Sequence, residues 1–185
     1  MSLERSGRWK DDRGVVFGLL LLGVAVMFYV SSRTAHQAGG FTPVGSRVAM
    51  PELVMTQLDG GTWRLAEHRG QVVLINYWAT WCGPCREEMP GLAEVARESG
   101  AQGLAVVGVS LDKGDRSAVQ AFVDHYKVPY PVVFPAALSQ VEQGMEGIPT
   151  TILVDRAGRV VKTYVGAVRR VDFEMDVKSA LAETR

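Results

Sequence analysis

The sequence has very little cysteine. Its 185 residues include two cysteines and three histidines. A disulfide scaffold and a four-thiolate zinc site both need more thiols than this, so both are excluded. An excess of charge of one sign is also missing, because 20 basic residues balance 20 acidic ones. This balance argues against a general nucleic-acid binder, and a hydrophobic content of 47% excludes a disordered polymer.

Charge is absent from one segment near the N-terminus. Residues 14–32 read GVVFGLLLLGVAVMFYVSS and contain no charged side chain. A helix of this length reaches about 28 Å, close to the roughly 30 Å hydrocarbon core of a bilayer. The segment also lacks the polar face of a soluble helix, so it predicts a transmembrane helix. It exceeds the apolar region of a signal peptide, roughly 7–15 residues, which favours a permanent anchor over a cleaved signal peptide.

Basic residues are distributed unevenly around this segment. Four precede it and two follow it closely, namely Arg5, Arg8, Lys10 and Arg13, and then Arg33 and Arg47. The positive-inside rule therefore places residues 1–13 in the cytoplasm. We expect a single-pass protein of the cytoplasmic membrane whose catalytic domain is extracytoplasmic, on the periplasmic side. Residues 33–46 are small and polar and predict a linker, followed by one globular domain over residues 47–185.

The rest of the chain alternates between strand-like and helix-like patterns. Strands are predicted at 53–57, 62–65, 72–78, 103–110, 132–134, 150–154 and 160–165. Helical spacing of apolar residues predicts helices at 84–99, 118–126 and 173–181. The sequences Asp59-Gly60-Gly61 and Asp155-Arg156-Ala157-Gly158 predict hairpin turns. We therefore expect an α/β fold with a mixed central sheet and flanking helices.

Both cysteines lie in the motif Trp81-Cys82-Gly83-Pro84-Cys85, where a predicted strand ends and a helix begins. Free backbone N–H groups and the helix dipole stabilise an anion at that position, which lowers the pKa of the first cysteine. The spacing places the second sulfur beside the first on the opening turn, and Pro84 suits a position that needs no N–H. We assign Cys82 as the attacking thiolate and Cys85 as the thiol that resolves the mixed disulfide.

Two other interpretations of the cysteine pair are open. A permanent disulfide could close this loop, although so short a loop restricts the unfolded chain little. A metal site would need histidines near the cysteines, but His68 and His125 are isolated and His36 lies in the linker. We expect no metal and no cofactor.

The segment 77–90, YWATWCGPCREEMP, resembles the active-site segment of thioredoxin-like proteins. More narrowly, the chain from about Arg47 to its end is similar to the membrane-anchored thiol-disulfide oxidoreductases of the TlpA/ResA type. Residues 147–150, GIPT, match the loop that carries a cis-proline in this fold, and the following residues 150–158 also fit the family. The resemblance implies a thioredoxin-like fold with an N-terminal hairpin and a central insertion, here at about 113–135.

The resemblance also implies roles for residues near the cysteines. Pro149 would be cis, and the backbone of Ile148 would then pair with an extended substrate segment. Glu88 matches an acidic position near the active site, and a carboxyl in a partly apolar pocket can move protons to or from Cys85. Asn76 stands where many thioredoxins have a buried aspartate that accepts a proton during thiol exchange. Asparagine cannot titrate, so in this chain the proton must travel elsewhere. Trp81 is expected to cover the site and form part of its docking face.

Our leading prediction is an extracytoplasmic reductase of protein disulfides. By family resemblance, its substrates include the Cys-x-x-Cys-His haem site of apocytochrome c, and a membrane protein of the CcdA/DsbD kind supplies its electrons. Membrane lipid would surround its anchor, and we expect a monomer that binds no nucleic acid. Three alternatives are an oxidase or isomerase that makes disulfides, a peroxidase, and a non-catalytic binding module. Peroxiredoxins have threonine or serine at the position of Ala79, which disfavours the peroxidase.

Overall fold

The computed structural model describes residues 40–114, 116–135 and 140–183. The predicted cytoplasmic segment 1–13, the predicted transmembrane helix 14–32 and residues 33–39 of the predicted linker lie outside these residues. Within the described ranges, no helix is long and apolar enough to cross a membrane.

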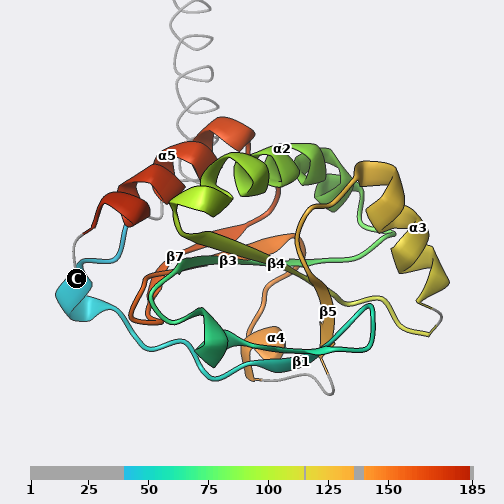
Figure 1. The fold of residues 1–185 in the computed structure, drawn as a ribbon, viewed down its shortest axis with the longest axis horizontal. Coiled ribbons are helices and arrows are strands. Elements are labelled where there is room, and N and C mark those ends of the chain that lie inside the picture. Colours follow the sequence, from blue (N-terminus) through green and yellow to red (C-terminus); the bar gives the residue numbers. More distant parts are fainter. Residues whose placement is uncertain (1–39, 115, 136–139, 184–185) are drawn as a thin grey trace, which may run out of the picture. The chain divides into compact units, whose positions relative to one another are not determined.

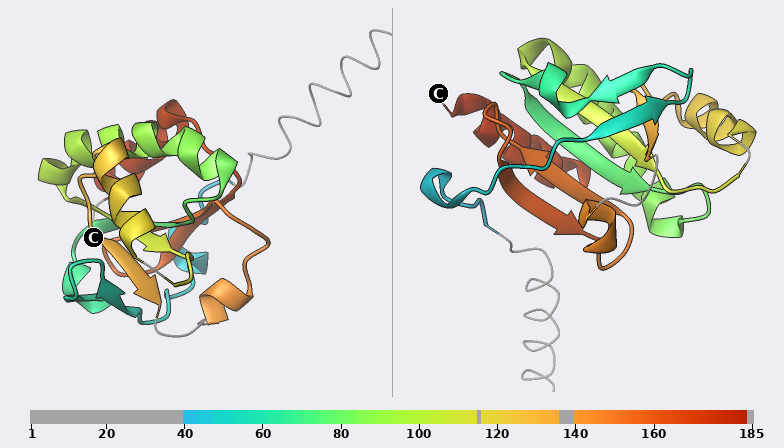
Figure 2. Two further views of the ribbon diagram at one scale, coloured as in Figure 1. Left: turned by 90° about the vertical axis from the view of Figure 1, so that its right-hand side faces the viewer. Right: turned by 90° about the horizontal axis from the view of Figure 1, so that it is seen from below.

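A seven-stranded mixed sheet forms the centre of the domain, in the order β2-β1-β5-β4-β3-β6-β7. The strands are β1 (Val54–Gln57), β2 (Thr62–Arg64), β3 (Val72–Trp78), β4 (Leu104–Ser110), β5 (Val132–Pro135), β6 (Thr150–Val154) and β7 (Val160–Val165). Strands β3, β4 and β5 are parallel, whereas the two hairpins β1–β2 and β6–β7 join them antiparallel. Seen from below, these hairpins lie at opposite edges of the sheet (Figure 2). The mixed sheet expected from the sequence is confirmed.

Helices cover one face of the sheet. Three of them, α2 (Gly83–Ser99), α3 (Ser117–Tyr126) and α5 (Arg170–Ala182), lie together on that side, and the short α4 (Gln140–Gln143) lies on the other (Figure 1). Every residue of β3 is buried, because alternate side chains enter the two cores. Asn76 and Trp78 therefore face α2, whereas Tyr77 faces the opposite side. Short 3-10 turns complete the element list at η1 (Val44–Ser46), η2 (Leu65–His68) and η3 (Gly100–Gln102).

Both predicted hairpins form with the expected turn residues. Gly60 and Gly158 have φ angles of 92° and 77°, in the left-handed region that favours glycine. A Cβ atom at Gly158 would lie 1.3 Å from Nη1 of Arg69, so a side chain there would displace the Arg69 guanidinium as well as strain the backbone.

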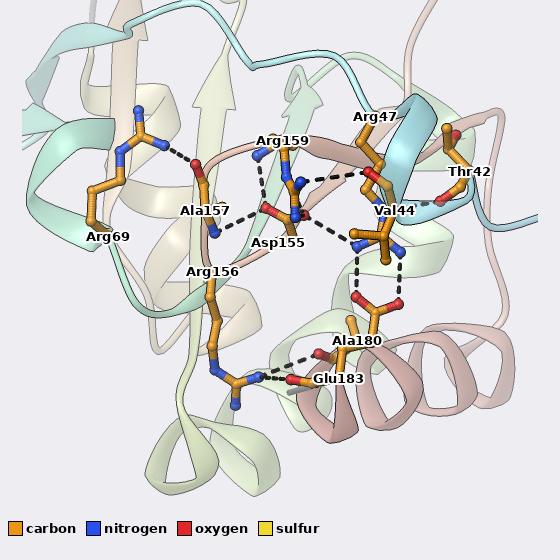
Figure 3. A network of polar contacts seen from close by, with 10 residues as sticks. All are labelled: Thr42, Val44, Arg47, Arg69, Asp155, Arg156, Ala157, Arg159, Ala180 and Glu183. Carbon is orange, nitrogen blue, oxygen red and sulfur yellow. Dashed lines mark hydrogen bonds and ion pairs between the residues drawn. The ribbon is translucent and has the colours of Figure 1, made fainter. Parts of the chain in front are cut away.

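A cluster of charged residues ties the beginning of the domain to its end. The Arg47 guanidinium donates to Asp155 Oδ2 at 3.1 Å and to both carboxylate oxygens of Glu183 at 2.6 Å. Arg159 donates to the same Asp155 oxygen at 2.9 Å, and Arg47 Nε donates to the carbonyl of Thr42 at 2.9 Å (Figure 3). We call Arg47, Asp155, Arg159 and Glu183 the Arg47 cluster. It joins residues 40–47, which we call the N-terminal segment of the described domain, to the β6–β7 turn and to the residue after α5.

Two further contacts reinforce this region. Nη1 of Arg156 donates to the carbonyl of Leu181 at 3.0 Å. It also donates to the carbonyl of Glu183 at 3.1 Å (Figure 3), and so satisfies carbonyl groups at the C-terminal end of α5. The N-terminal segment also runs beside the edge strand β7, where Thr42 N–H donates to the carbonyl of Val161 at 2.9 Å. Thr42, which falls within the predicted linker, is therefore held against the sheet.

Candidate active site

The two cysteines form a disulfide at the N-terminus of α2. Their sulfurs are 2.04 Å apart and their Cα atoms 5.3 Å apart. Cys82 is the N-cap of the helix, and its Sγ accepts a hydrogen bond from the backbone N–H of Cys85 at 3.2 Å. Pro84 occupies the first turn, as the sequence predicts. A backbone donor therefore points at the Cys82 sulfur, and this geometry would stabilise a thiolate there.

The surroundings of the two sulfurs differ. Cys85 is completely buried, whereas Cys82 is 5% exposed and follows Trp81, which is 71% exposed. A large, exposed aromatic side chain thus lies next in sequence to the more accessible cysteine. Because it is exposed, Trp81 is available to contact a docked protein. Aromatic side chains contribute much of the contact energy at protein interfaces.

The loop before β6 passes beside Cys82. The peptide bond between Ile148 and Pro149 is cis, and the Ile148 carbonyl oxygen lies 3.7 Å from Cys82 Sγ. Two hydrogen bonds hold this loop, from Thr150 Oγ1 to the carbonyl of Gly147 at 2.6 Å and from Gly166 N–H to the carbonyl of Pro149 at 2.8 Å. The backbone of Ile148 therefore lies beside Cys82, the more exposed of the two cysteines.

Glu88 is buried one turn beyond Cys85, with 4% of its surface exposed. Its Oε1 accepts a hydrogen bond from Asn76 Nδ2 at 2.8 Å, and its Oε2 accepts one from the backbone N–H of Val168 at 3.0 Å. Burial raises the pKa of Glu88 to about 7, and the two donors act in the opposite direction. A carboxyl group with this pKa exchanges protons readily near neutral pH.

The raised pKa of Glu88 predicts a dependence of stability on pH. Relative to its ordinary value of 4.5, a folded-state pKa of about 7 means that the folded protein binds this proton more tightly than the unfolded chain does. Glu88 thus contributes stability that is fully present below about pH 4.5 and is lost as the pH rises through about 7. At 1.36 kcal/mol for each pKa unit, the loss is on the order of 3 kcal/mol.

The matched variant is Glu88→Gln, which keeps the size of the side chain but cannot titrate. We expect the unfolding free energy of the native protein to fall relative to that of Glu88→Gln over this pH range. Urea unfolding of both proteins at about pH 4.5, 6 and 8 measures the difference. Two parallel pH profiles would contradict the buried, titrating carboxyl.

A second carboxylate, which sequence analysis missed, orders the turn before Cys82. Asp112 accepts hydrogen bonds from Thr80 N–H at 2.9 Å, from Thr80 Oγ1 at 2.6 Å and from Ser110 Oγ at 2.9 Å. The N–H of Cys82 closes the same turn on the carbonyl of Ala79 at 3.1 Å. A pattern could have indicated this contact: β3 and β4 are parallel, so the polar residues that follow them meet at one edge of the sheet.

The described histidines lie in packing and surface contacts. His68 stacks on Trp63 and bonds to Gln71, and His125 packs edge-on against Tyr126. His36 lies outside the described residues. In the part of the chain that the structure describes, no group of three or more His, Cys, Asp or Glu side chains is arranged to hold a metal ion.

Comparisons with known proteins agree on one family. Residues 47–165 match the AhpC/TSA family. The thiol-disulfide oxidoreductase ResA of Geobacillus thermodenitrificans is 30% identical over 168 residues, which cover 90% of this chain and 93% of that protein. The thioredoxin-like protein YneN of Bacillus subtilis is 32% identical over 126 residues, or 67% of this chain and 74% of YneN.

Solved structures give the same result. A thiol:disulfide interchange protein of the thioredoxin family from Chlorobium tepidum superimposes with a TM-score of 0.66 at 27% identity. The match covers 74% of this chain and 97% of that protein. The described domain thus has a thioredoxin-like fold, as the sequence resemblance implied.

Proposed function

Because the chain belongs to the AhpC/TSA family of thioredoxin-like proteins and is a thiol-disulfide oxidoreductase, we propose that it reduces disulfide bonds in other proteins. One observation carries this proposal. The Cys82–Cys85 disulfide caps α2, with a backbone N–H directed at Cys82 Sγ and the Ile148 carbonyl 3.7 Å from it. This arrangement combines an anion-stabilising helix terminus with a backbone segment suited to bind an extended substrate.

The reaction starts from the dithiol form of the enzyme. The Cys82 thiolate attacks one sulfur of the substrate disulfide, which forms a mixed disulfide and releases the other substrate sulfur as a thiolate. Cys85 then loses its proton and attacks Cys82 Sγ. The Cys82–Cys85 disulfide forms, and the second substrate thiolate leaves. Two electrons have passed from the enzyme to the substrate, and the structure has the oxidised form of the pair.

Glu88 is the proposed acceptor of the Cys85 proton. It lies on the same helix, one turn after Cys85, and both side chains are buried. A pKa of about 7 lets Glu88 accept a proton near neutral pH and give it up again. Asn76 cannot take this role, since an amide does not titrate.

The proposed setting follows from the N-terminal sequence and the family resemblance. The uncharged segment 14–32 would anchor the chain in the cytoplasmic membrane, with the domain on the periplasmic side. Outside the cytoplasm, cytosolic reductants do not reach the cysteines, so a membrane protein of the CcdA/DsbD kind would regenerate the dithiol. We propose apocytochrome c as a substrate and a monomeric enzyme.

The redox potential of the Cys82–Cys85 couple tests the direction of the reaction. We expect a value near that of reducing thioredoxins, about −270 mV, because Gly83-Pro84 matches their active-site dipeptide. Equilibration of the full-length chain with dithiothreitol buffers, followed by thiol alkylation, gives the value. A potential above about −150 mV would identify a disulfide-forming oxidase or isomerase instead. Rapid peroxide consumption by the dithiol form would favour the peroxidase.

A further inference from the structure

One buried amide group beside Glu88 has an unused acceptor. Both described bonds of the Asn76 side chain come from Nδ2, which donates to Glu88 Oε1 at 2.8 Å and to Thr151 Oγ1 at 2.9 Å. Its Oδ1 is buried and has no partner within the described part of the chain. A buried acceptor without a donor costs about 1–3 kcal/mol, so an amide that served only packing would be a poor choice at this position.

The other side of the Glu88 carboxylate is occupied by a fixed donor. Oε2 accepts from the backbone N–H of Val168 at 3.0 Å, and a backbone N–H cannot become an acceptor. When Glu88 takes up a proton, that proton therefore belongs on Oε1, the oxygen that faces Asn76. The protonated Oε1 then needs an acceptor in the place where Nδ2 now lies.

The remaining groups near Glu88 do not supply this acceptor. Tyr130 is buried nearby. Its burial and, to a smaller extent, the charge of Glu88 raise the pKa of Tyr130, whereas Arg97 lowers it. Its hydroxyl donates to Met89 Sδ at 2.9 Å, and among the described residues no hydrogen bond joins it to Glu88, whose partners are Asn76 and Val168. On α2 itself, Cys85 is the neighbouring titratable side chain and is held in the disulfide.

We propose that Asn76 is a positioning residue that partners Glu88 in both of its protonation states by turning its side-chain amide through half a revolution. With Glu88 ionised, Nδ2 donates to Oε1. With Glu88 protonated, Oδ1 accepts the proton of Oε1, and the Thr151 hydroxyl reverses to donate to Oδ1. In each orientation one atom of the amide lacks a partner, Oδ1 before the turn and Nδ2 after it. The hydrogen bonds therefore fix neither orientation of the amide. This proposal rests on the proposed role of Glu88 in proton transfer.

NMR on the full-length oxidised chain tests the turn directly. We expect the side-chain N–H resonances of Asn76 to shift with pH and to share one midpoint with the carboxyl carbon of Glu88. If the carboxyl carbon titrates and the Asn76 resonances stay constant, the amide does not turn and the proposal fails. No substrate enters this measurement, so a failed reductase assay would overturn the proposed function and leave this test intact.

A double-mutant cycle with Asn76→Ala and Glu88→Ala gives a second, independent readout. A partner of both states keeps its interaction energy with Glu88 on both sides of the titration. We therefore expect an interaction energy at about pH 5 that is at least half of its value at about pH 9. An interaction confined to the higher pH would show that Asn76 binds the carboxylate alone. Thr151→Val is the matched control, since it removes the second contact of the amide and keeps the contact with Glu88.

Discussion

Replacing Cys82 by serine should reduce disulfide exchange by ~10³-fold or more. The remaining cysteine, Cys85, is completely buried, so it cannot meet a disulfide on another protein. A serine hydroxyl at position 82 stays protonated at neutral pH and is a far weaker nucleophile toward sulfur than a thiolate. Reduction of insulin by the full-length chain, followed as turbidity with an external reductant, measures the loss.

Cys85→Ser is the matched control, because it removes the other sulfur of the same pair. This variant keeps the first half of the reaction and loses the second, so Cys82 should remain joined to its substrate as a mixed disulfide. Mass spectrometry of the trapped species would identify the substrate and test the proposed apocytochrome c. Trapping by Cys82→Ser instead would reverse the roles assigned to the two sulfurs.

Replacing Asp155 by alanine should lower the unfolding free energy by about 3–5 kcal/mol. The Arg47 side chain is 2% exposed, and Asp155 is one of its two carboxylate partners. Asp155 Oδ1 also accepts from the backbone N–H groups of Ala157 and Arg159, both at 2.9 Å, so the variant leaves turn donors without a partner as well. Denaturant unfolding with far-UV detection measures the change.

An exposed ion pair provides the control for Asp155→Ala. Arg64 and Glu67 lie 4.0 Å apart with side chains 51% and 63% exposed, and Glu67→Ala should cost less than about 1 kcal/mol. Similar losses in the two variants would show that burial adds nothing to the Arg47 cluster.

The cost of Asp155→Ala should also depend on pH. Burial pushes the pKa of Asp155 upward, but the hydrogen bonds from Arg159 and Arg47 outweigh it and hold the pKa below its ordinary value. A lowered pKa means that the stabilisation is present above the ordinary value of about 4 and is lost as the pH falls through the folded-state pKa. The difference between the native protein and the variant should therefore shrink in acid.

Local sequence patterns predicted most of the secondary structure. The apolar run 72–78 coincides with β3, because a strand covered on both faces needs apolar residues at consecutive positions. Predicted hairpin turns at Gly60 and Gly158 form, since few other residues adopt their backbone angles. Helix α4 was missed, because its four residues are too few to show a helical period.

Contacts between distant segments could not be predicted in the same way. The sequence placed Glu88 one turn from Cys85, but its bond to Val168 spans 80 positions. The bond of Thr80 to Asp112 spans 32 positions, and that of Arg47 to Glu183 spans 136. Such pairs depend on how the sheet and the helices pack together. The hydrophobic period of a single helix or strand gives no information on that packing. The Cys-x-x-Cys site could be predicted from the sequence because its residues are adjacent in the chain.

The Arg47 cluster brings the two ends of the described domain together. Through Arg47, the carbonyl of Thr42 and the carboxylate of Glu183 bind a single guanidinium group, so the end of α5 lies close to the segment that contains η1 (Figure 1). A domain with adjacent ends tolerates circular permutation, in which a short peptide joins the old ends and the chain is opened at another loop. The order in which the strands are synthesised can therefore be rearranged while the architecture is kept.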